Sequence, residues 1–162
     1  MEENGGKMIR TATVADLDAM LDLAETKRVQ YATYTPRFHQ PAPNARSVHR
    51  PFLESQLQRE KIIALVADDA GIINGFLIAS TGPAPPVYDV GGLTTGVDDF
   101  AVRHPSLWAT VGRALLDEVR ARAQEQGSVQ LIVVCSPKDT PKRDMLRDAN
   151  LDVASEWFVG SM

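Results

Sequence analysis

The sequence predicts an α/β fold in which helices pack on a mixed β-sheet. Short apolar runs with the length of buried strands occur at Lys61–Ala67, Phe76–Ser80 and Val129–Cys135. Around them lie segments whose apolar residues recur at helical spacing, the longest from Leu107 to Ala123. Stretches rich in proline and glycine separate these segments, as loops do. The expected order is a strand, two helices, three strands, a helix, a strand, a helix and a final strand.

The N-terminal elements are expected to be a strand and a long helix. Residues Met8 to Thr13 alternate in polarity as a half-buried strand does. Thr13 or Asp16 can cap a helix that continues to about Tyr34. The residues before Met8 predict a disordered lead-in at 1–7, which leaves 8–162 as a single domain. The buried stripe of the helix is expected to contain Leu17, Met20, Leu21 and Ala24.

The next segment, Thr35–Asn44, holds three prolines and is therefore expected to be irregular. A second helix is expected at Ser47–Glu60. The strand Lys61–Ala67 and a strand over Ile72–Ser80 form a predicted hairpin around an Asp-Asp-Ala-Gly turn. Asn-Gly at residues 74–75 lies inside an apolar run and so predicts a β-bulge. The glycines and prolines of Thr81–Gly96 predict a long irregular loop.

The central strand and helix occupy Val97–Gln126. Phe100–Val102 is a short apolar run, and Pro105 and Ser106 interrupt the chain before the helix, with Ser106 as a possible N-cap. A helix start exposes N–H groups that have no partner inside the helix, so this junction can bind a phosphate. Gly112, near the start of the helix, has no side chain, so either a ligand or the backbone of the sheet can come close to it.

The C-terminal part is expected to add a strand, a helix and a last strand. The strand is the apolar run Val129–Cys135, and Pro141 suits the first position of the helix after it. Asn150 suits the end of that helix. Asp152–Val159 is predicted to be the final strand, which makes this C-terminus short.

Composition excludes several classes of protein. The 162 residues suit one domain, and the net charge of -4 does not favour nucleic acid as a partner. One cysteine excludes an internal disulfide, and three widely separated histidines give no spacing typical of a metal site. No apolar run has the roughly 20 residues needed to span a bilayer, and the N-terminus lacks the apolar core of a signal peptide. The expectation is a cytoplasmic protein without metal or membrane partner.

The junction resembles motif A of the GCN5-related N-acetyltransferases. The residues that carry the resemblance are Phe-Ala-Val at 100–102, the following proline turn, Gly112 and the Arg-Ala-Leu-Leu that continues the helix. The order of the elements matches that family over nearly the whole chain. The resemblance implies two central parallel strands that splay apart, and acetyl-CoA as co-substrate of an N-acetyltransferase. It also implies direct attack of a primary amine on the thioester.

The same resemblance suggests roles for individual residues. The backbone of Phe100, Ala101 and Val102 would hold the pantetheine arm and the oxyanion. Asp98 and Asp99 are candidate general bases whose side chains, being adjacent on a strand, are expected to face opposite sides. Candidate residues of the acceptor pocket are Tyr31, Tyr34 and Tyr88. The pyrophosphate would be held by the backbone of Leu107, Trp108, Ala109, Thr110, Val111, Gly112 and Arg113.

Two departures from the family pattern keep other functions open. Leu107 stands where the family usually has a basic residue, and Leu146 stands where many members have the tyrosine that protonates the leaving thiolate. An inactive domain that binds CoA as a sensor or partner is therefore the alternative to the enzyme. A different reading has Cys135 as a nucleophile with His39, His49 or His104 as its base. A homodimer that completes the short C-terminus is also possible.

Overall fold

The computed structural model describes residues 8–162. Its strands form one five-stranded sheet in the order β1-β2-β3-β4-β5. Neighbouring strands are antiparallel except for β4 and β5, which run parallel. This confirms the predicted mixed α/β fold, whereas the predicted lead-in at residues 1–7 lies outside the described residues. The strands are β1 (Met8–Thr11), β2 (Ile62–Asp69), β3 (Ile72–Pro83), β4 (Leu93–Val102) and β5 (Ser128–Val133).

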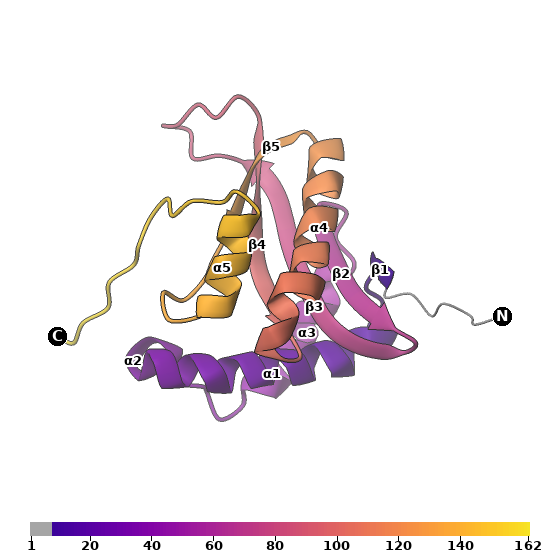
Figure 1. Ribbon diagram of the computed structural model, residues 1–162, viewed down its shortest axis with the longest axis vertical. Helices are drawn as coiled ribbons and strands as arrows, with labels where there is room; N and C mark the ends of the chain where they lie inside the picture. Colours follow the sequence, from indigo (N-terminus) through magenta and orange to yellow (C-terminus); the bar gives the residue numbers. More distant parts are fainter. Residues whose placement is uncertain (1–7) are drawn as a thin grey trace.

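Helices cover both faces of the sheet (Figure 1). α1 (Leu17–Tyr34) and α3 (Ala45–Gln56) pack on one face, and α4 (Arg113–Glu125) and α5 (Thr140–Asp148) pack on the other. Alternate residues of β3 serve the two faces, since Phe76 belongs to the core under α1 and Leu77 to the core under α4. This alternation follows from the period of two in a strand and explains the continuous apolar run in the sequence.

The helices lie close to where the sequence predicts them. α1 ends at Tyr34 as expected, α5 is preceded by Asp139, and Asn150 adopts a positive φ of 63° just after α5. One correction concerns the proline-rich segment, which contains a single helical turn, α2 (Pro36–His39). Proline at the first position of a helix leaves no hydrogen bond unmade, so Pro36 begins this turn rather than preventing it.

The 3₁₀ turn (Val14–Asp16) that leads into α1 is fixed by a capping box and a partly buried ion pair. Asp16 accepts a hydrogen bond from the backbone N–H of Thr13 at 2.8 Å. Its two oxygens also accept from the guanidinium of Arg10, each at 2.8 Å, and Arg10 further contacts Asp68 of β2. These bonds tie β1, β2 and α1 together. The Arg10 hydrogen bond is the largest cause that holds the pKa of Asp16 below its ordinary value of 3.8.

We expect Arg10→Met to destabilise the fold by about 1–2 kcal/mol at pH 7, discounted for partial solvent screening. A carboxylate whose pKa is depressed in the folded state stabilises above its unfolded pKa and loses that contribution as the pH falls. The variant should therefore lose less stability than the parent between about pH 5 and pH 2. Urea unfolding at several pH values measures this. Arg46→Met, which removes an exposed ion pair, is the control, and parallel pH curves for parent and Arg10→Met would contradict the argument.

The bulge predicted at Asn74-Gly75 is present. Ala67 pairs with Gly75 and Asp68 with Ile73, so Asn74 is the extra residue. By contrast, the irregular loop predicted for Thr81–Gly96 is wrong at both ends. Strand pairing continues through Thr81 and Thr95, whose buried hydroxyls lie 2.8 Å apart, and only residues 84–92 lack sheet structure. Glycine and proline near these strand ends misled the sequence-based boundary because cross-strand pairing outweighs local propensity.

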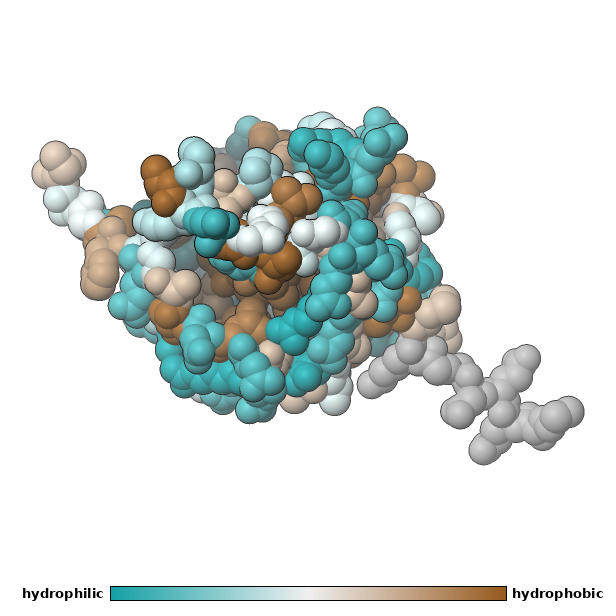
Figure 2. Space-filling model, turned by 90° about the horizontal axis from the view of Figure 1, so that it is seen from above, coloured by the Kyte–Doolittle hydropathy of each residue, from teal (hydrophilic) through white to brown (hydrophobic). Residues whose placement is uncertain are grey.

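The final strand predicted at Asp152–Val159 is also wrong. Residues 149–162 have no regular structure, and Trp157 and Phe158 are almost fully exposed. Figure 2 shows this tail projecting from the body of the molecule, at the left of that view. A strand forms only where a neighbour accepts its backbone hydrogen bonds, and the tail does not pair with β5. The shortened C-terminus therefore leaves β5 as an edge strand.

Candidate active site

The candidate site lies where the two parallel strands of the sheet separate. Pairing of β4 with β5 runs from Leu93 opposite Ser128 to Val97 opposite Val133 and then stops. β4 continues to Val102 paired only with β3. The open edge of β4 therefore faces the segment that follows β5, and this is the splay that the resemblance implies.

A β-bulge in β4 coincides with the point of separation. Val97 pairs with Ala79 and Asp99 with Ile78, so Asp98 is the extra residue. The bulge changes the expected orientation of the two acids, because a regular strand would place them on opposite faces. Asp99 contacts Lys27 of α1, while Asp98 lines a cleft that contains the same lysine. Both carboxyl groups thus lie on the α1 side, which corrects the sequence-based expectation.

The amides of Phe100 and Val102 point to the open edge. The N–H of Arg103 donates to Asn74 O of β3 at 2.8 Å. Because backbone groups alternate between the two edges of a strand, the peptide groups of Phe100 and Val102 face away from β3. The N–H of Ala101 faces β3 by the same alternation. Two free donors spaced along one edge are what an extended ligand or an oxyanion requires.

Asp99 is held by a network that sequence reasoning missed. Arg28 carries only donors, so its Nη1 donates to Nδ1 of His49 at 3.0 Å. In the neutral ring the proton is then on Nε2, which donates to Asp99 Oδ2 at 2.9 Å. Lys27 Nζ lies 3.7 Å from Asp99 Oδ1. Burial raises the pKa of Asp99, but the hydrogen bond from His49 and the charges of Lys27 and Arg28 lower it below its ordinary value.

Asp98 has no such partners among residues 8–162 and keeps an exposed side of its side chain. Partial burial and the charge of neighbouring Asp99 both raise the pKa of Asp98. It lines a cleft of about 320 Å³ between α1, α2 and the ends of β4 and β5. His39, in the same cleft, has its pKa lowered by burial and by the charge of Lys27, and its Nδ1 is buried without a hydrogen-bond partner among residues 8–162. The cleft is lined by Lys27, Arg28, Tyr31, His39, Gln40, Asp98 and Val134.

The structure separates the three predicted acceptor tyrosines. Tyr31 lines the cleft, and its hydroxyl donates to Asp139 Oδ2 at 2.7 Å. Tyr34 packs against Tyr31 with ring centroids 5.6 Å apart. Tyr88 is 70% exposed in the loop between β3 and β4, which Figure 1 shows at the opposite end of the sheet from α1 and α2. Tyr88 is therefore not brought to the cleft with the other two.

The start of the central helix consists of helical turns and is not an open phosphate-binding loop. A 3₁₀ turn (Pro105–Leu107) leads into a π-helical turn (Trp108–Gly112) before α4. The amides of Leu107 and Trp108 donate to backbone carbonyls one turn back, whereas Ala109 and Thr110 are exposed. A Cβ added at Gly112 would come within 2.5 Å of the indole of Trp108. Packing of this indole thus explains why the position holds glycine.

Sequence reasoning also missed the buried residues behind the open edge. Lys142 of α5 is 2% exposed, and its Nζ donates to Val134 O at 2.9 Å. Asp139 is 1% exposed, and its Oδ1 has no hydrogen-bond partner in the described part of the chain. The surface-like sequence of α5 and of the residue before it gave no signal that Lys142 and Asp139 are buried.

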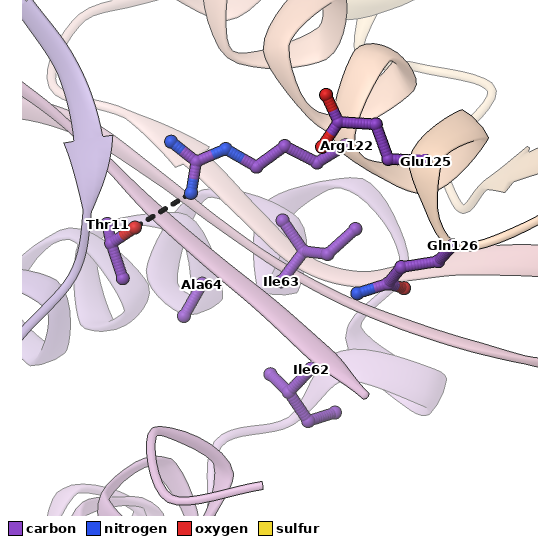
Figure 3. Close-up of a pocket in the computed structure, with 7 residues that line it drawn as sticks. All are labelled: Thr11, Ile62, Ile63, Ala64, Arg122, Glu125 and Gln126. Carbon is purple, nitrogen blue, oxygen red and sulfur yellow. Dashed lines mark hydrogen bonds between the residues drawn. The ribbon is translucent and has the colours of Figure 1, made fainter. Parts of the chain in front are cut away.

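The Cys135 thiol and a second cavity are less suited to catalysis. Burial raises the pKa of the Cys135 thiol, which disfavours the nucleophilic thiolate. A second cavity, of about 290 Å³, lies between β2 and the end of α4 (Figure 3). Its arginine, Arg122, is already paired with Glu118 and with the hydroxyl of Thr11. The residues that the structure describes include no cluster suited to a metal ion, and none of their helices is long and apolar enough to cross a membrane.

Comparison with known proteins locates the fold. No protein-family model matches the chain, and no curated protein matches it by sequence. A mutant BH1408 protein from Bacillus halodurans superposes with a TM-score of 0.82 at 13% identity, covering 96% of this chain and 99% of that one. A predicted acetyltransferase with acetyl-CoA from Clostridium acetobutylicum gives 0.75 at 13% identity, covering 96% of each chain.

A third solved structure adds an enzyme with a named acceptor class. The aminoglycoside 6'-N-acetyltransferase of Acinetobacter haemolyticus gives a TM-score of 0.70 at 13% identity, and the match covers 96% of this chain and 97% of that one. These superpositions span whole chains, so they compare complete folds. Together with the parted parallel strands, they show that the chain has the fold of the GCN5-related N-acetyltransferases.

Proposed function

We propose that the protein transfers an acetyl group from acetyl-CoA to an amine by direct attack on the thioester. The observation that carries this proposal is the open edge of β4 beyond Val97, where two backbone amides have lost a partner strand. An amide donor left free inside a fold needs a partner, and a pantetheine arm lying along β4 would supply one. Solved acetyltransferases of the same fold, one with acetyl-CoA, support acetyl-CoA as the co-substrate.

The open edge of β4 fits acetyl-CoA better than the start of the central helix does. Phe100 and Val102 would hold the pantetheine and the thioester oxygen through their N–H groups. The diphosphate would meet the exposed first turns at Ala109 and Thr110, helped by the positive end of the helix dipole. Leu107, Trp108, Val111, Gly112 and Arg113 belong to the same proposed segment, in which Trp108, Val111 and Gly112 are buried.

The attacking amine must lose a proton, and we assign its acceptance to Asp98, directly or through water. Asp98 lines the cleft and has a raised pKa, whereas Asp99 is engaged by Lys27 and His49. The amine would enter from the α1 side of the sheet, through the cleft that Tyr31 and His39 line. Lys27 and Arg28 line the same cleft, so acceptors with a carboxylate beside the amine belong in any substrate screen.

The alternative is a domain that binds CoA without turnover. The helical turns at Pro105–Gly112 and the indole packed over Gly112 favour it, because they leave fewer amides for the diphosphate than an open loop would. The two functions differ in their products. Both predict binding of CoA, and only the enzyme releases the free thiol.

Calorimetric titration with acetyl-CoA and CoA tests binding. Release of the CoA thiol is then measured over a panel of amines that includes amino acids, polyamines, aminoglycosides and peptides. We expect micromolar binding, and turnover with at least one class of amine. Absence of binding to both ligands would refute the proposal, and binding without turnover on any amine would favour the sensor.

We also propose a homodimer that covers the edge of β5. Val129, Ile132 and Val134 are exposed on or just after this strand, and the tail carries exposed Trp157 and Phe158. An exposed edge strand tends to recruit another strand, and the tail of a second copy has the residues to provide it. Sedimentation should show a dimer for the full chain and a monomer after truncation at Leu151. A monomeric full chain would contradict this.

A further inference from the structure

The ammonium of Lys142 occupies the space between the parted strands. Its Nζ donates to the carbonyl of Val134, the residue directly after β5, at 2.9 Å. It lies 5.3 Å from the ring centroid of Phe100 on β4 and 5.1 Å from that of Trp108 at the helix start. The group is thus in contact with each of the three segments that border the gap, and the residue is 2% exposed.

This ammonium is incompletely satisfied. It has three N–H donors, and Val134 O is its only hydrogen-bond acceptor among residues 8–162. The two aromatic faces stabilise the charge but accept no conventional hydrogen bond. Burial and the charge of Lys27 lower the pKa of Lys142 to about 8. The groups whose charges act against this lowering are Cys135, Asp139 and Asp99.

The tyrosine hydroxyl that lines the cleft is committed elsewhere. The phenol of Tyr31 donates its proton to Asp139, and burial together with the charge of Asp139 raises the pKa of Tyr31. Leu146, at the position where related enzymes carry a tyrosine, lies in the apolar core. Lys142 stands one helical turn before Leu146, so its long side chain extends into the gap from the same helix.

We propose that the ammonium of Lys142 protonates the CoA thiolate as it leaves, an inference that rests on the acetyl transfer proposed above. The amine nitrogen forms a bond to the thioester carbonyl carbon, and the carbon–sulfur bond breaks with its electron pair on sulfur. Sulfur takes a proton from Nζ of Lys142. The amine's own proton passes to Asp98 or water, and Lys142 regains a proton from solvent. The products are an N-acetylated amine and CoA thiol.

The acid strength of Lys142 suits the protonation of a leaving thiolate. A thiol has an ordinary pKa of about 8.5, close to that of Lys142, so the proton transfer is nearly balanced in energy. Because the protonated form is the acid, kcat should fall as the pH rises through about 8. Lys142→Met keeps the length and apolar contacts of the side chain and removes the proton, and Lys142→Arg keeps the charge but does not release a proton at these pH values.

The kinetic test measures kcat at saturating acetyl-CoA and amine from pH 6 to 10. We expect Lys142→Met to lower kcat about 100-fold with little change in acetyl-CoA binding, and to lose the decline above pH 8. Lys142→Arg should lose the same pH limb. Lys138→Met is the matched control, since Lys138 is exposed on the preceding loop and its ammonium donates to Tyr34 O alone among residues 8–162. A purely structural Lys142 would change stability or binding and leave the pH profile in place, which would overturn the proposal.

A second measurement needs no acceptor amine. The thiol of bound CoA is titrated by the ultraviolet absorbance of its thiolate, in a Cys135→Ser background that removes the protein's own thiol. A neighbouring ammonium should lower the thiol pKa relative to the Lys142→Met complex. Equal pKa values in the two complexes refute the role of Lys142 while leaving acetyl-CoA use intact. Failure of the parent to bind CoA refutes the proposed function and this inference with it.

Discussion

Replacing Asp98 with asparagine is expected to lower kcat for amine acetylation about 100-fold at neutral pH. The side chain keeps its shape but no longer accepts the proton that the amine must lose. Since burial and Asp99 raise the pKa of Asp98, the parent should gain activity as the pH rises through that pKa, and the variant should lack this limb. Steady-state rates from pH 4 to 8 measure both effects, and binding of acetyl-CoA should not change.

Asp99→Asn is the matched control, because it alters the neighbouring carboxyl group without removing a free base. Asp99 is bonded to His49 and lies beside Lys27, so its substitution should lower thermal stability and weaken acceptor binding more than it changes the pH limb. If Asp99→Asn abolishes the limb and Asp98→Asn retains it, the base has been assigned to the wrong residue. His39→Gln then becomes the next test, because His39 faces the same cleft.

Trp108→Ala is expected to destabilise the protein by about 3–5 kcal/mol. The indole is 5% exposed, lies edge-on to Phe100 at 4.8 Å between centroids, and covers Gly112. Removing it leaves a cavity where β4, α5 and the helix start meet. Urea unfolding followed by circular dichroism measures the loss. A change below about 1 kcal/mol would show that the surroundings collapse into the space.

Because of the same indole, we expect the effect of Gly112→Ala on stability to reverse its sign when Trp108 is removed. In the parent, Gly112→Ala should destabilise by about 1–3 kcal/mol, because the new methyl group meets the rigid ring within 2.5 Å. In the Trp108→Ala background the clash is gone, and alanine is the better helix former by about 1 kcal/mol, so the substitution should stabilise. A double-mutant cycle gives the coupling directly. Additive effects would mean that Gly112 is not there for packing.

Much of the fold could be predicted from the sequence because it depends on local signals. Alternating and continuous apolar runs located β2 and β3, helical spacing located α1 and α4, and Asn74-Gly75 marked a bulge. The errors fall where pairing with a distant segment decides. Thr81 and Thr95 extend β3 and β4 because they face each other, and the tail lacks a strand because it does not pair with a neighbour.

The site was less predictable for the same reason. The sequence marked Asp98 and Asp99 as chemically important, but the roles of the two acids depend on a one-residue bulge that no local pattern reveals. His49 and Arg28 come from different helices and meet only in the folded chain. Lys142 looks like a solvated residue of a polar helix, and only the packing of Phe100 and Trp108 around it shows that its charge is buried.

The bulge in β4 consists of one extra residue at the point where the sheet opens. Val97 and Phe100 belong to the core under α4, and Ala101 belongs to the core under α1, so Asp98 is the residue out of phase in this strand. Loss of a single codon would restore regular alternation without moving any core side chain to the wrong face. We expect a chain shortened by this residue to keep its core but to lack the carboxyl group that lines the cleft.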